Sequence, residues 1–268
     1  MGMETSIEGS RREATGTQCI QRSFAIVRLL AGGDCDGEKL VDIAGSLKLS
    51  HPTAHRILKA LEQEGIVERA SGTQRYRLAA ETAWLGVAPF NRCPITRLAV
   101  PTLEDLAQKT GDSIFLSVPS HNDSVYADRR FGNFPLQAQR IKVGARRPLG
   151  VSIGGRVMLG FMGEERLANT MRQNAERFAD WHCSDATVLA GVEAARAQGY
   201  LSEDSLIDPG RHVLAVPVRD VVGRAVGAIS IIAPTARLKG ERASRLLPLL
   251  RAGARDVAQA LGRQRMSA

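Results

Sequence analysis

The stretch VDIAGSLKLSHPTAHRILKALEQEGIVERASGTQRYRLA, residues 41–79, decides the fold of the first third of the chain. Apolar residues at helical spacing predict a short helix over 39–47; they are Leu40, Ile43, Ala44 and Leu47. A longer helix is expected over 51–64, because Ser50 stands where an N-cap belongs and Pro52 lies in the first turn. The stretch therefore predicts two helices joined by a short turn.

The flanking residues add a hairpin and a preceding helix. Gly65 is a suitable residue to end the second helix, and residues 66–79 predict a strand, a turn at Ser71-Gly72 and a second strand. Upstream, a helix is expected from Gln21, with an apolar stripe formed by Phe24, Val27, Leu30 and Ala31. Helix, helix, turn, helix and hairpin in this order predict a winged helix-turn-helix.

The helix over 51–64 has one apolar and one polar face. The apolar face consists of Ala54, Ile57, Leu58 and Leu61. A recognition helix needs small or polar groups at its N-terminal end and cations that hold phosphates. The residues predicted to contact DNA are Arg22, Ser50, Pro52, Thr53, His55, Arg56, Lys59 and Arg75. For one helix alone, a solvated polar face would be the simpler explanation. The hairpin, with basic residues Arg69, Arg75 and Arg77, favours DNA binding.

Net charge supports a local rather than a global attraction to DNA. The chain of 268 residues has 36 Lys and Arg and 28 Asp and Glu, a net charge of +8. Residues 1–90 contain 11 side chains of each sign, whereas 48–77 contain six basic and three acidic ones. DNA affinity must therefore come from cations placed at particular positions.

Several protein classes are excluded by composition. No apolar run approaches the roughly 20 residues of a membrane-spanning helix, and the first 20 residues lack the apolar segment of a secretory signal. The cysteines, Cys19, Cys35, Cys93 and Cys183, are too far apart for a disulfide framework or a zinc ribbon. We expect a cytoplasmic protein with a sizeable core and without association with a membrane.

The rest of the chain predicts a second domain of the α+β class. We expect a disordered arm over 1–18, the winged helix-turn-helix over 19–79, a helical linker over 80–110 and an effector-binding, oligomerising domain over 111–268. Strands are expected at 114–118, 124–131, 135–142, 212–219 and 223–233, and helices at 154–178, 187–198 and 239–262. Because the two types do not alternate regularly, the sheet should be mainly antiparallel.

The chain resembles the IclR-type transcriptional regulators. The resemblance begins at QRSFAIVRLLA (21–31), runs through the stretch quoted above, and continues in LEDLAQKTGDSIFLSV (103–118), VGARRPLGVSIGGRVMLGFM (143–162) and GRAVGAISIIAP (223–234). It covers about residues 20–262. It implies a winged helix that dimerises on a palindromic operator in double-stranded DNA. It also implies a GAF-like domain that binds a small, usually acidic effector and pairs dimers into tetramers.

The resemblance also implies an effector site. Its positions in this chain are Leu136, Ile153, Gly154, Ser202 or Glu203, Arg211, Val213, Ser230 and Ile232. Ile153 and Ile232 stand where the family often has small or polar residues, so a more apolar pocket is expected. Gly154 and Gly155 open a helix whose uncovered amides could receive a carboxylate. An acid with an aromatic or branched body would fit this pocket.

A motif typical of hydrolases competes with this interpretation. Residues 150–154, GVSIG, match GxSxG, and Asp208 and His212 follow in hydrolase order. In hydrolases this motif forms a nucleophile elbow, a sharp turn that follows a buried strand. The residues before Ser152, ARRPLG, do not predict such a strand. We therefore predict no enzyme, no catalytic residue and no cofactor. His182-Cys183 lacks a third ligand at usable spacing, so no metal is predicted. The basic stretch Arg140, Lys142, Arg146 and Arg147 is interpreted as a solvated edge, with attraction of anions or contacts within an oligomer as the alternative.

The sequence predicts a DNA-binding regulator that responds to a ligand, with an operon for breakdown of a small carboxylic acid as its target. One alternative is a constitutive operator binder whose second domain only oligomerises. The other is a hydrolase that uses Ser152.

Overall fold

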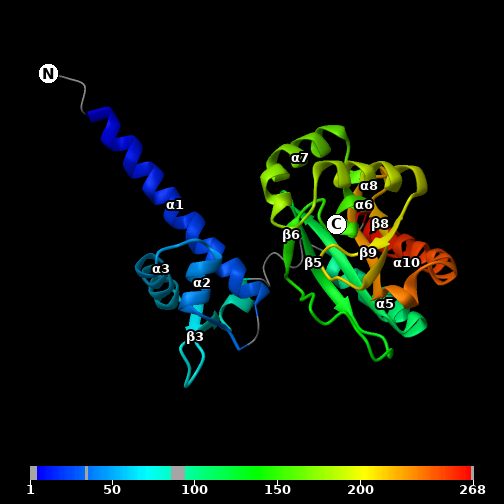
Figure 1. The fold of residues 1–268 in the computed structure, drawn as a ribbon, viewed down its shortest axis with the longest axis horizontal. Helices are drawn as coiled ribbons and strands as arrows, with labels where there is room; N and C mark the ends of the chain where they lie inside the picture. Colours follow the sequence, from blue (N-terminus) through cyan, green and yellow to red (C-terminus); the bar gives the residue numbers. More distant parts are fainter. Residues whose placement is uncertain (1–4, 34–35, 86–93, 267–268) are drawn as a thin grey trace. The chain divides into compact units, whose positions relative to one another are not determined.

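The computed structural model describes residues 5–33, 36–85 and 94–266, and side chains between 17 and 264 (Figure 1). The chain divides into two units, Met1–Arg92 and Cys93–Ala268. Among the described residues, no helix combines the length and the apolar character required to cross a bilayer.

The first unit is a winged helix-turn-helix, as predicted. Its elements are α1 (Thr5–Gly32), β1 (Glu38–Lys39), α2 (Leu40–Ser46), α3 (His51–Gln63), β2 (Val67–Arg69) and β3 (Arg75–Leu78). The three strands form an antiparallel sheet in the order β1-β3-β2. The short strand β1 was not predicted, because two residues carry no periodic signal.

One apolar core holds the first unit together. Its fully buried members are Ile26, Leu30, Ile43, Ile57, Leu58, Val67 and Tyr76. The expected stripe on α1 was partly wrong, because Phe24 is 55% exposed whereas Ile26 is fully buried. Ile26 and Leu30 are one turn apart and face α3 and β3 together, which turns Phe24 outward.

Two expected boundaries differ from the structure. The expected disordered arm over 1–18 is helical from Thr5, since α1 extends through this segment; residues 1–4 lie outside the described part. The expected linker over 80–110 includes α5 (Pro94–Thr110), which belongs to the second unit because Ile95, Ala99 and Leu103 are buried in its core. Residues 86–93, which include Pro89, lie outside the described residues.

The second unit contains a six-stranded antiparallel sheet, which confirms the predicted α+β class. Its strands are β4 (Ser113–Ser120), β5 (Asp123–Arg130), β6 (Arg146–Pro148), β7 (Leu201–Asp204), β8 (Arg211–Arg219) and β9 (Ala225–Pro234). They lie in the order β6-β5-β4-β9-β8-β7, and every pair is antiparallel.

Helices cover both faces of this sheet (Figure 1). They are α5, α6 (Ile153–Gly160), α7 (Glu164–Ala179), α8 (Asp185–Gln198), α9 (Thr235–Leu238) and α10 (Glu241–Met266). On one face, α5 and α10 pack against Ile114, Leu214 and Ile231. On the other, α6 packs against Phe115, Val213 and their neighbours. Successive strand residues thus alternate between two separate cores.

Three expectations for this unit were wrong. Residues 135–142 form turns and bends instead of a strand, because their backbone is held by side chains of neighbouring segments. The single helix expected over 154–178 is two helices, interrupted at Gly163, whose φ of 89° breaks the helical backbone. The strands β6 and β7 were missed because they are short and partly polar.

Candidate nucleic-acid interface and ligand cavity

The N-terminal end of α3 is built as the sequence predicted. Ser50 is the N-cap, in extended conformation, and Pro52 occupies the first turn. The Ser50 hydroxyl lies 2.8 Å from the Thr53 hydroxyl instead of capping a backbone amide. The pair holds two hydroxyls together at the exposed start of the helix.

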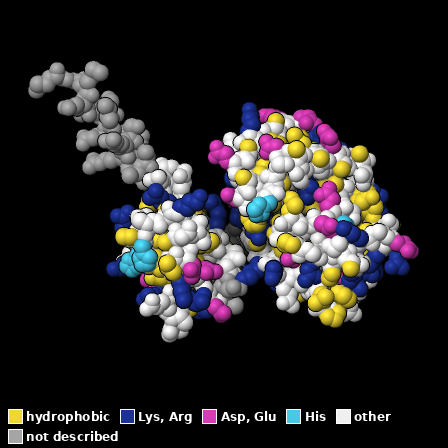
Figure 2. Space-filling view, viewed as in Figure 1, with side chains coloured by type: hydrophobic (Ala, Val, Ile, Leu, Met, Phe, Trp, Pro, Cys, Tyr) yellow, Lys and Arg dark blue, Asp and Glu magenta, His cyan; other side chains and the backbone are white. Residues whose placement is uncertain are grey.

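The two faces of α3 differ in burial as the spacing of its apolar residues predicted. Ala54, Ile57 and Leu58 are buried against the core, and Leu61 is half-buried. The opposite side exposes His51, Pro52, His55, Arg56 and Lys59. Figure 2 shows histidine and cationic side chains on this side of the first unit. The face offers hydrogen-bond donors and positive charge at the end of a helix, the combination that phosphates and base edges require.

The arginines of the hairpin also bind their own unit. Arg75 Nη1 donates a hydrogen bond to the Gly37 carbonyl at 2.9 Å, and Arg77 pairs with Glu68 at 2.7 Å. The Arg69 guanidinium lies 5.4 Å from the centre of the Tyr76 ring. Arg75 is half-buried. Its side chain therefore stabilises the fold of the first unit in addition to any contact with DNA.

A cavity lies between α6 and the sheet of the second unit. It is lined by Ser117, Tyr126, Ile141, Val151, Ser152, Ile153, Gly154, Ser205, Leu206, Ile207, Val213, Ser230 and Ile232. The free space between these residues admits about one water molecule. Five of the predicted effector residues line it: Ile153, Gly154, Val213, Ser230 and Ile232.

Two serine hydroxyls meet below the start of α6. Ser117 and Ser230 are 1% and 3% exposed, yet no hydrogen bond to another protein group is found for either hydroxyl in the described part of the chain. A Cβ on Gly154 would lie 3.2 Å from Ser230 Oγ and 3.6 Å from Ser117 Oγ. Both hydroxyls therefore converge on the backbone at the helix N-terminus.

The helix N-terminus keeps two amides for the cavity. Ser152 caps α6 by accepting a hydrogen bond from the Gly155 amide at 3.0 Å, and its carbonyl accepts one from the Arg156 amide. The expectation that the Gly155 amide is uncovered was therefore wrong. The amides of Ile153 and Gly154 have no carbonyl of the preceding turn to bond, so they are the groups that an anion could use.

Tyr126 extends this polar end of the cavity. Burial raises its pKa to about 12, while Arg147 and a hydrogen bond with Ser152 favour the ionised form less strongly. The phenol is therefore protonated at neutral pH and can donate a hydrogen bond. Ser152 Oγ lies 3.3 Å from Ser124 Oγ, so two serine hydroxyls meet at this end of the cavity.

Four predicted effector positions lie outside the cavity lining. Leu136 is 59% exposed, and Glu203 pairs with the buried Arg156 at 2.7 Å. The Ser202 hydroxyl lies 2.9 Å from His212 Nε2. Arg211 donates to the Leu136 and Gln137 carbonyls at 2.9 and 3.1 Å. The polar side chains of Ser202, Glu203 and Arg211 are thus already engaged by protein groups, and the Leu136 side chain is exposed.

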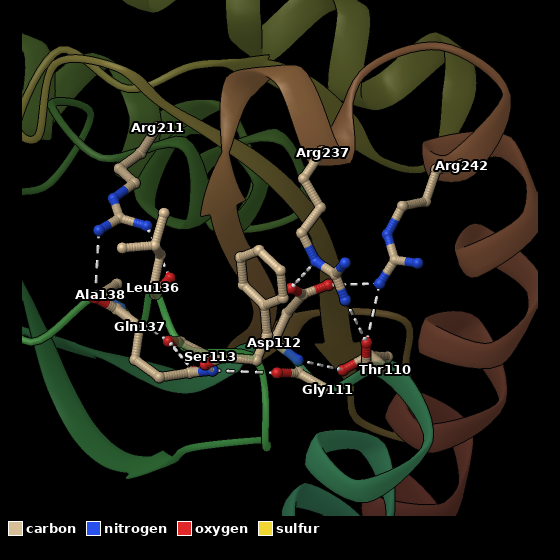
Figure 3. A network of polar contacts seen from close by, with 11 residues as sticks. Thr110, Gly111, Asp112, Ser113, Leu136, Gln137, Ala138, Arg211, Arg237 and Arg242 are labelled. Atoms are coloured by element: carbon tan, nitrogen blue, oxygen red, sulfur yellow. Dashed lines mark hydrogen bonds and ion pairs between the residues drawn. The ribbon is translucent and has the colours of Figure 1, made fainter.

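A polar network fixes the loop that carries the cavity residue Ile141 (Figure 3). Gln137 donates to the Gly111 carbonyl and accepts from Ser113 Oγ, which also accepts from the Ala138 amide. Arg211 holds the same loop from β8. Beside it, the buried Asp112 pairs with Arg237 and Arg242 at 2.6 and 2.7 Å. The network positions one wall of the cavity.

The cavity residues that the prediction missed are Ser117, Tyr126, Ile141, Val151, Ser152, Ser205, Leu206 and Ile207. Ser117 is a hydroxyl within the apolar run IFLSV, as Ser230 is within AISIIA, and this pattern could have identified it. Ser205, Leu206 and Ile207 belong to the loop between β7 and β8, and no pattern in the sequence places that loop over α6.

The GxSxG serine and the groups that follow it do not assemble a hydrolase triad. Ser152 bonds within the start of α6, whereas His212 Nδ1 lies 2.9 Å from Asp204. Lys239 and His212 lower the pKa of Asp204 to about 2. These contacts join β7, β8 and the segment after α9.

The basic stretch has mainly intramolecular partners. Arg146 pairs with Asp123 at 3.0 Å, and the Arg147 guanidinium lies 4.3 Å from the centre of the Trp181 ring. Burial lowers the pKa of Arg147. His182 is exposed, and no group of three or more potential metal ligands occurs among the described side chains.

Comparison with known proteins agrees with both halves of the structure. Residues 20–71 match the IclR helix-turn-helix domain, and residues 88–259 match the C-terminal domain of bacterial IclR transcriptional regulators. The glycerol operon regulatory protein of Streptomyces coelicolor is 32% identical over 253 residues, 93% of this chain and 97% of the relative. The repressor AllR of Escherichia coli is 27% identical, over 92% and 91% of the two chains.

Solved structures share the fold. An IclR homologue from Microbacterium hydrocarbonoxydans, crystallised with 4-hydroxybenzoate, has a TM-score of 0.67 and 22% identity, over 89% of this chain and 98% of the other. The IclR protein of Thermotoga maritima has a TM-score of 0.63 and 20% identity, over 92% and 99%.

Proposed function

The chain belongs to the IclR family of bacterial transcriptional regulators, and we propose that it controls an operon for breakdown of a small carboxylic acid that binds its cavity. Membership of the family makes it a DNA-binding regulator with an effector domain rather than an enzyme. The acid and the operon are the proposed part.

The observation that carries the proposed ligand is the group of donors at the start of α6. Ser117 and Ser230 place two buried hydroxyls beside the amides of Ile153 and Gly154, and apolar side chains form the remaining walls. Amides at a helix N-terminus favour a carboxylate, and the walls favour an apolar body. The relative crystallised with 4-hydroxybenzoate supports an aromatic acid.

An aromatic or branched acid is much larger than one water molecule, which is about what the cavity admits. Such a ligand must therefore displace part of the cavity wall. The loop between Asp204 and Arg211 is the segment best suited to move. It carries the lining residues Ser205, Leu206 and Ile207, and Leu206 is 41% exposed. We propose that ligand entry moves this loop, while the network around Gln137 keeps the opposite wall fixed.

DNA is proposed to bind along the exposed side of α3. Arg56 is placed to read a base, Lys59 to hold a phosphate, and Ser50, Pro52, Thr53 and His55 to approach the groove. Arg22 on α1 and Arg75 in the hairpin would contact the phosphate backbone of the DNA. With so few cations per copy, tight binding requires a dimer on a palindromic operator, or a pair of dimers.

The decisive experiment combines a footprint with a ligand screen. The operator is located by footprinting the DNA upstream of the chain's own gene and its neighbours. Aromatic and branched carboxylates are then screened by thermal shift and by their effect on operator affinity. We expect at least one acid to raise the melting temperature and to change operator affinity, because the two effects are linked.

Two outcomes would contradict the proposal. If no acid changed either quantity, the alternative of a constitutive binder with an oligomerising second domain would stand. If a footprint covered a single half-site occupied at full affinity by a monomer, the dimeric arrangement would be wrong. Residues 1–92 alone should bind the operator much more weakly than the full chain.

A further inference from the structure

We propose that the cavity binds its ligand through uncharged donors alone, with Ser117 and Tyr126 as ligand-binding residues, and that it therefore selects monocarboxylates against dicarboxylates and phosphate esters. This inference rests on the proposed function, which supplies an acid as the ligand. It adds two residues to the site and a limit on the charge of the ligand.

The lining of the cavity carries no formal charge. Its 13 residues are serines, a tyrosine, a glycine and aliphatic residues. Two cations of neighbouring segments, Arg211 and Arg147, lie outside this lining. Arg211 bonds two carbonyls and lies 3.7 Å from Asp208, and Arg147 stacks on Trp181 and donates to the Arg146 carbonyl at 2.7 Å. Arg147 also interacts electrostatically with Tyr126, but neither arginine lines the cavity, so a bound anion would have no cation in direct contact.

The Ser117 hydroxyl is available to donate a hydrogen bond to a ligand. It lies on β4 beside β9, which carries Ser230, and both side chains lie on the α6 face of the sheet. Each is at least 97% buried, and each hydroxyl lacks a hydrogen-bond partner among the described protein groups. Neither Oγ is among the fully buried side-chain atoms without a partner, so both hydroxyls keep a small accessible surface at the cavity, where a ligand can reach them. An oxygen of the ligand placed below Gly154 would satisfy both hydroxyls together.

Tyr126 adds a third hydroxyl from the next strand. It is directly opposite Ser117 in the β4–β5 register and also lines the cavity. Ser152, which contributes to the pKa shift of Tyr126, also accepts the Gly155 amide, so the phenol lies near the start of α6. Three hydroxyls and two amides are enough donors for the two oxygens of one carboxylate.

The same donors cannot accommodate a second negative charge. One carboxylate is matched by short hydrogen bonds and by the positive end of the helix. A second carboxylate or a phosphate dianion would be buried against Ile, Val and Leu side chains without any partner, which is strongly unfavourable. The cavity is thus expected to discriminate between acids by charge at similar size.

Matched probes test this selectivity on the full-length protein. Isothermal titration calorimetry compares 4-methylbenzoate with terephthalate, and benzoate with phenyl phosphate. We expect each monocarboxylate to bind at least one hundredfold more tightly than its dianionic counterpart. Because no cation is involved, affinity for the monocarboxylates should change less than about threefold between 50 and 500 mM NaCl.

Variants test the two added residues. Ser117→Ala and Tyr126→Phe should each weaken binding of the preferred monocarboxylate about tenfold or more. Ser244→Ala on α10 and Tyr200→Phe, both away from the cavity, are the matched controls and should bind as the wild type does. If Ser117→Ala proves unstable, Ser117→Cys replaces it, since the thiol has a similar size and is a poor donor.

The outcomes separate this inference from the proposed function. Dianions that bind as tightly as monocarboxylates, or variants with unchanged affinity, overturn the charge limit or the role of the two residues and leave an acid-responsive regulator intact. Failure of the whole carboxylate panel to bind overturns the proposed function and this inference together.

Discussion

The Ser230 hydroxyl lies 3.2 Å from the point that a Cβ on Gly154 would occupy. Strand β9 and helix α6 thus approach each other closely at the centre of the cavity, and only a residue without a side chain fits there undisturbed. From the sequence, Gly154 was predicted to bind a carboxylate through its uncovered amide. The structure adds that its missing side chain keeps the space below the helix open.

Replacing Gly154 with alanine should abolish the response to ligand with little effect on the fold. The methyl group would occupy the space between Ser117 and Ser230, while alanine favours a helix over glycine by about 1 kcal/mol. We expect at least tenfold weaker ligand binding, measured by calorimetry, and unchanged operator affinity. Gly262→Ala in α10, where the new methyl meets only Val221 at 3.7 Å, is the control. Wild-type ligand affinity in Gly154→Ala would place the ligand elsewhere.

Arg56→Ala should weaken operator binding by about 1–3 kcal/mol and relax sequence preference at one base pair. The side chain is exposed on α3, opposite the buried Ala54, Ile57 and Leu58, so unfolding should be unaffected. Competition binding against a set of single-base operator variants measures both effects. Arg172→Ala on α7 serves as the control for loss of one exposed cation.

Lys59→Ala should weaken binding to all DNA sequences alike. A lysine on the exposed face of α3 acts as a point charge for a phosphate, so its loss should reduce the slope of log affinity against log salt by about one. Titrations at several NaCl concentrations give this slope. If neither Lys59→Ala nor Arg56→Ala changed affinity, α3 would not be the recognition helix.

Arg75→Ala should lower the stability of the first unit as well as its affinity for DNA. The half-buried guanidinium bonds the Gly37 carbonyl, a charged hydrogen bond that stabilises the fold by about 1–2 kcal/mol. Arg77→Ala removes only an exposed pair with Glu68 and should cost less than about 1 kcal/mol. Urea unfolding of both variants compares them directly. Equal losses would contradict a structural role for Arg75.

Alkaline pH should destabilise the protein through Tyr126. Its pKa is raised from 10.0 to about 12 in the fold, so the folded state retains a proton that the unfolded chain loses. The free energy of unfolding should therefore fall between pH 10 and 12, by about 2–3 kcal/mol from this group. Comparing unfolding of wild type and Tyr126→Phe isolates the effect from other groups. Parallel pH profiles for the two proteins would show that Tyr126 ionises normally.

Local sequence was sufficient for the features that depend on spacing and capping in the helix-turn-helix and on the order of strands and helices in the second unit. The faces of α3, the N-cap at Ser50 and the antiparallel character of the sheet all follow from spacing and from short-range backbone chemistry. The GxSxG motif was set aside because no buried strand was expected before Ser152; the structure has only the short edge strand β6 there, in an antiparallel sheet.

Only the tertiary structure could decide which face of a buried strand meets the cavity and which charged groups are already paired. In β4, residues pointing to both sides are buried, so alternation does not show that Ser117 faces α6 and Leu116 faces α5 and α10. Arg211 and Glu203 look like ligand contacts in the sequence, but their partners come from segments distant in the chain. A side chain's type determines what it can bond, whereas packing between remote segments determines what it does bond.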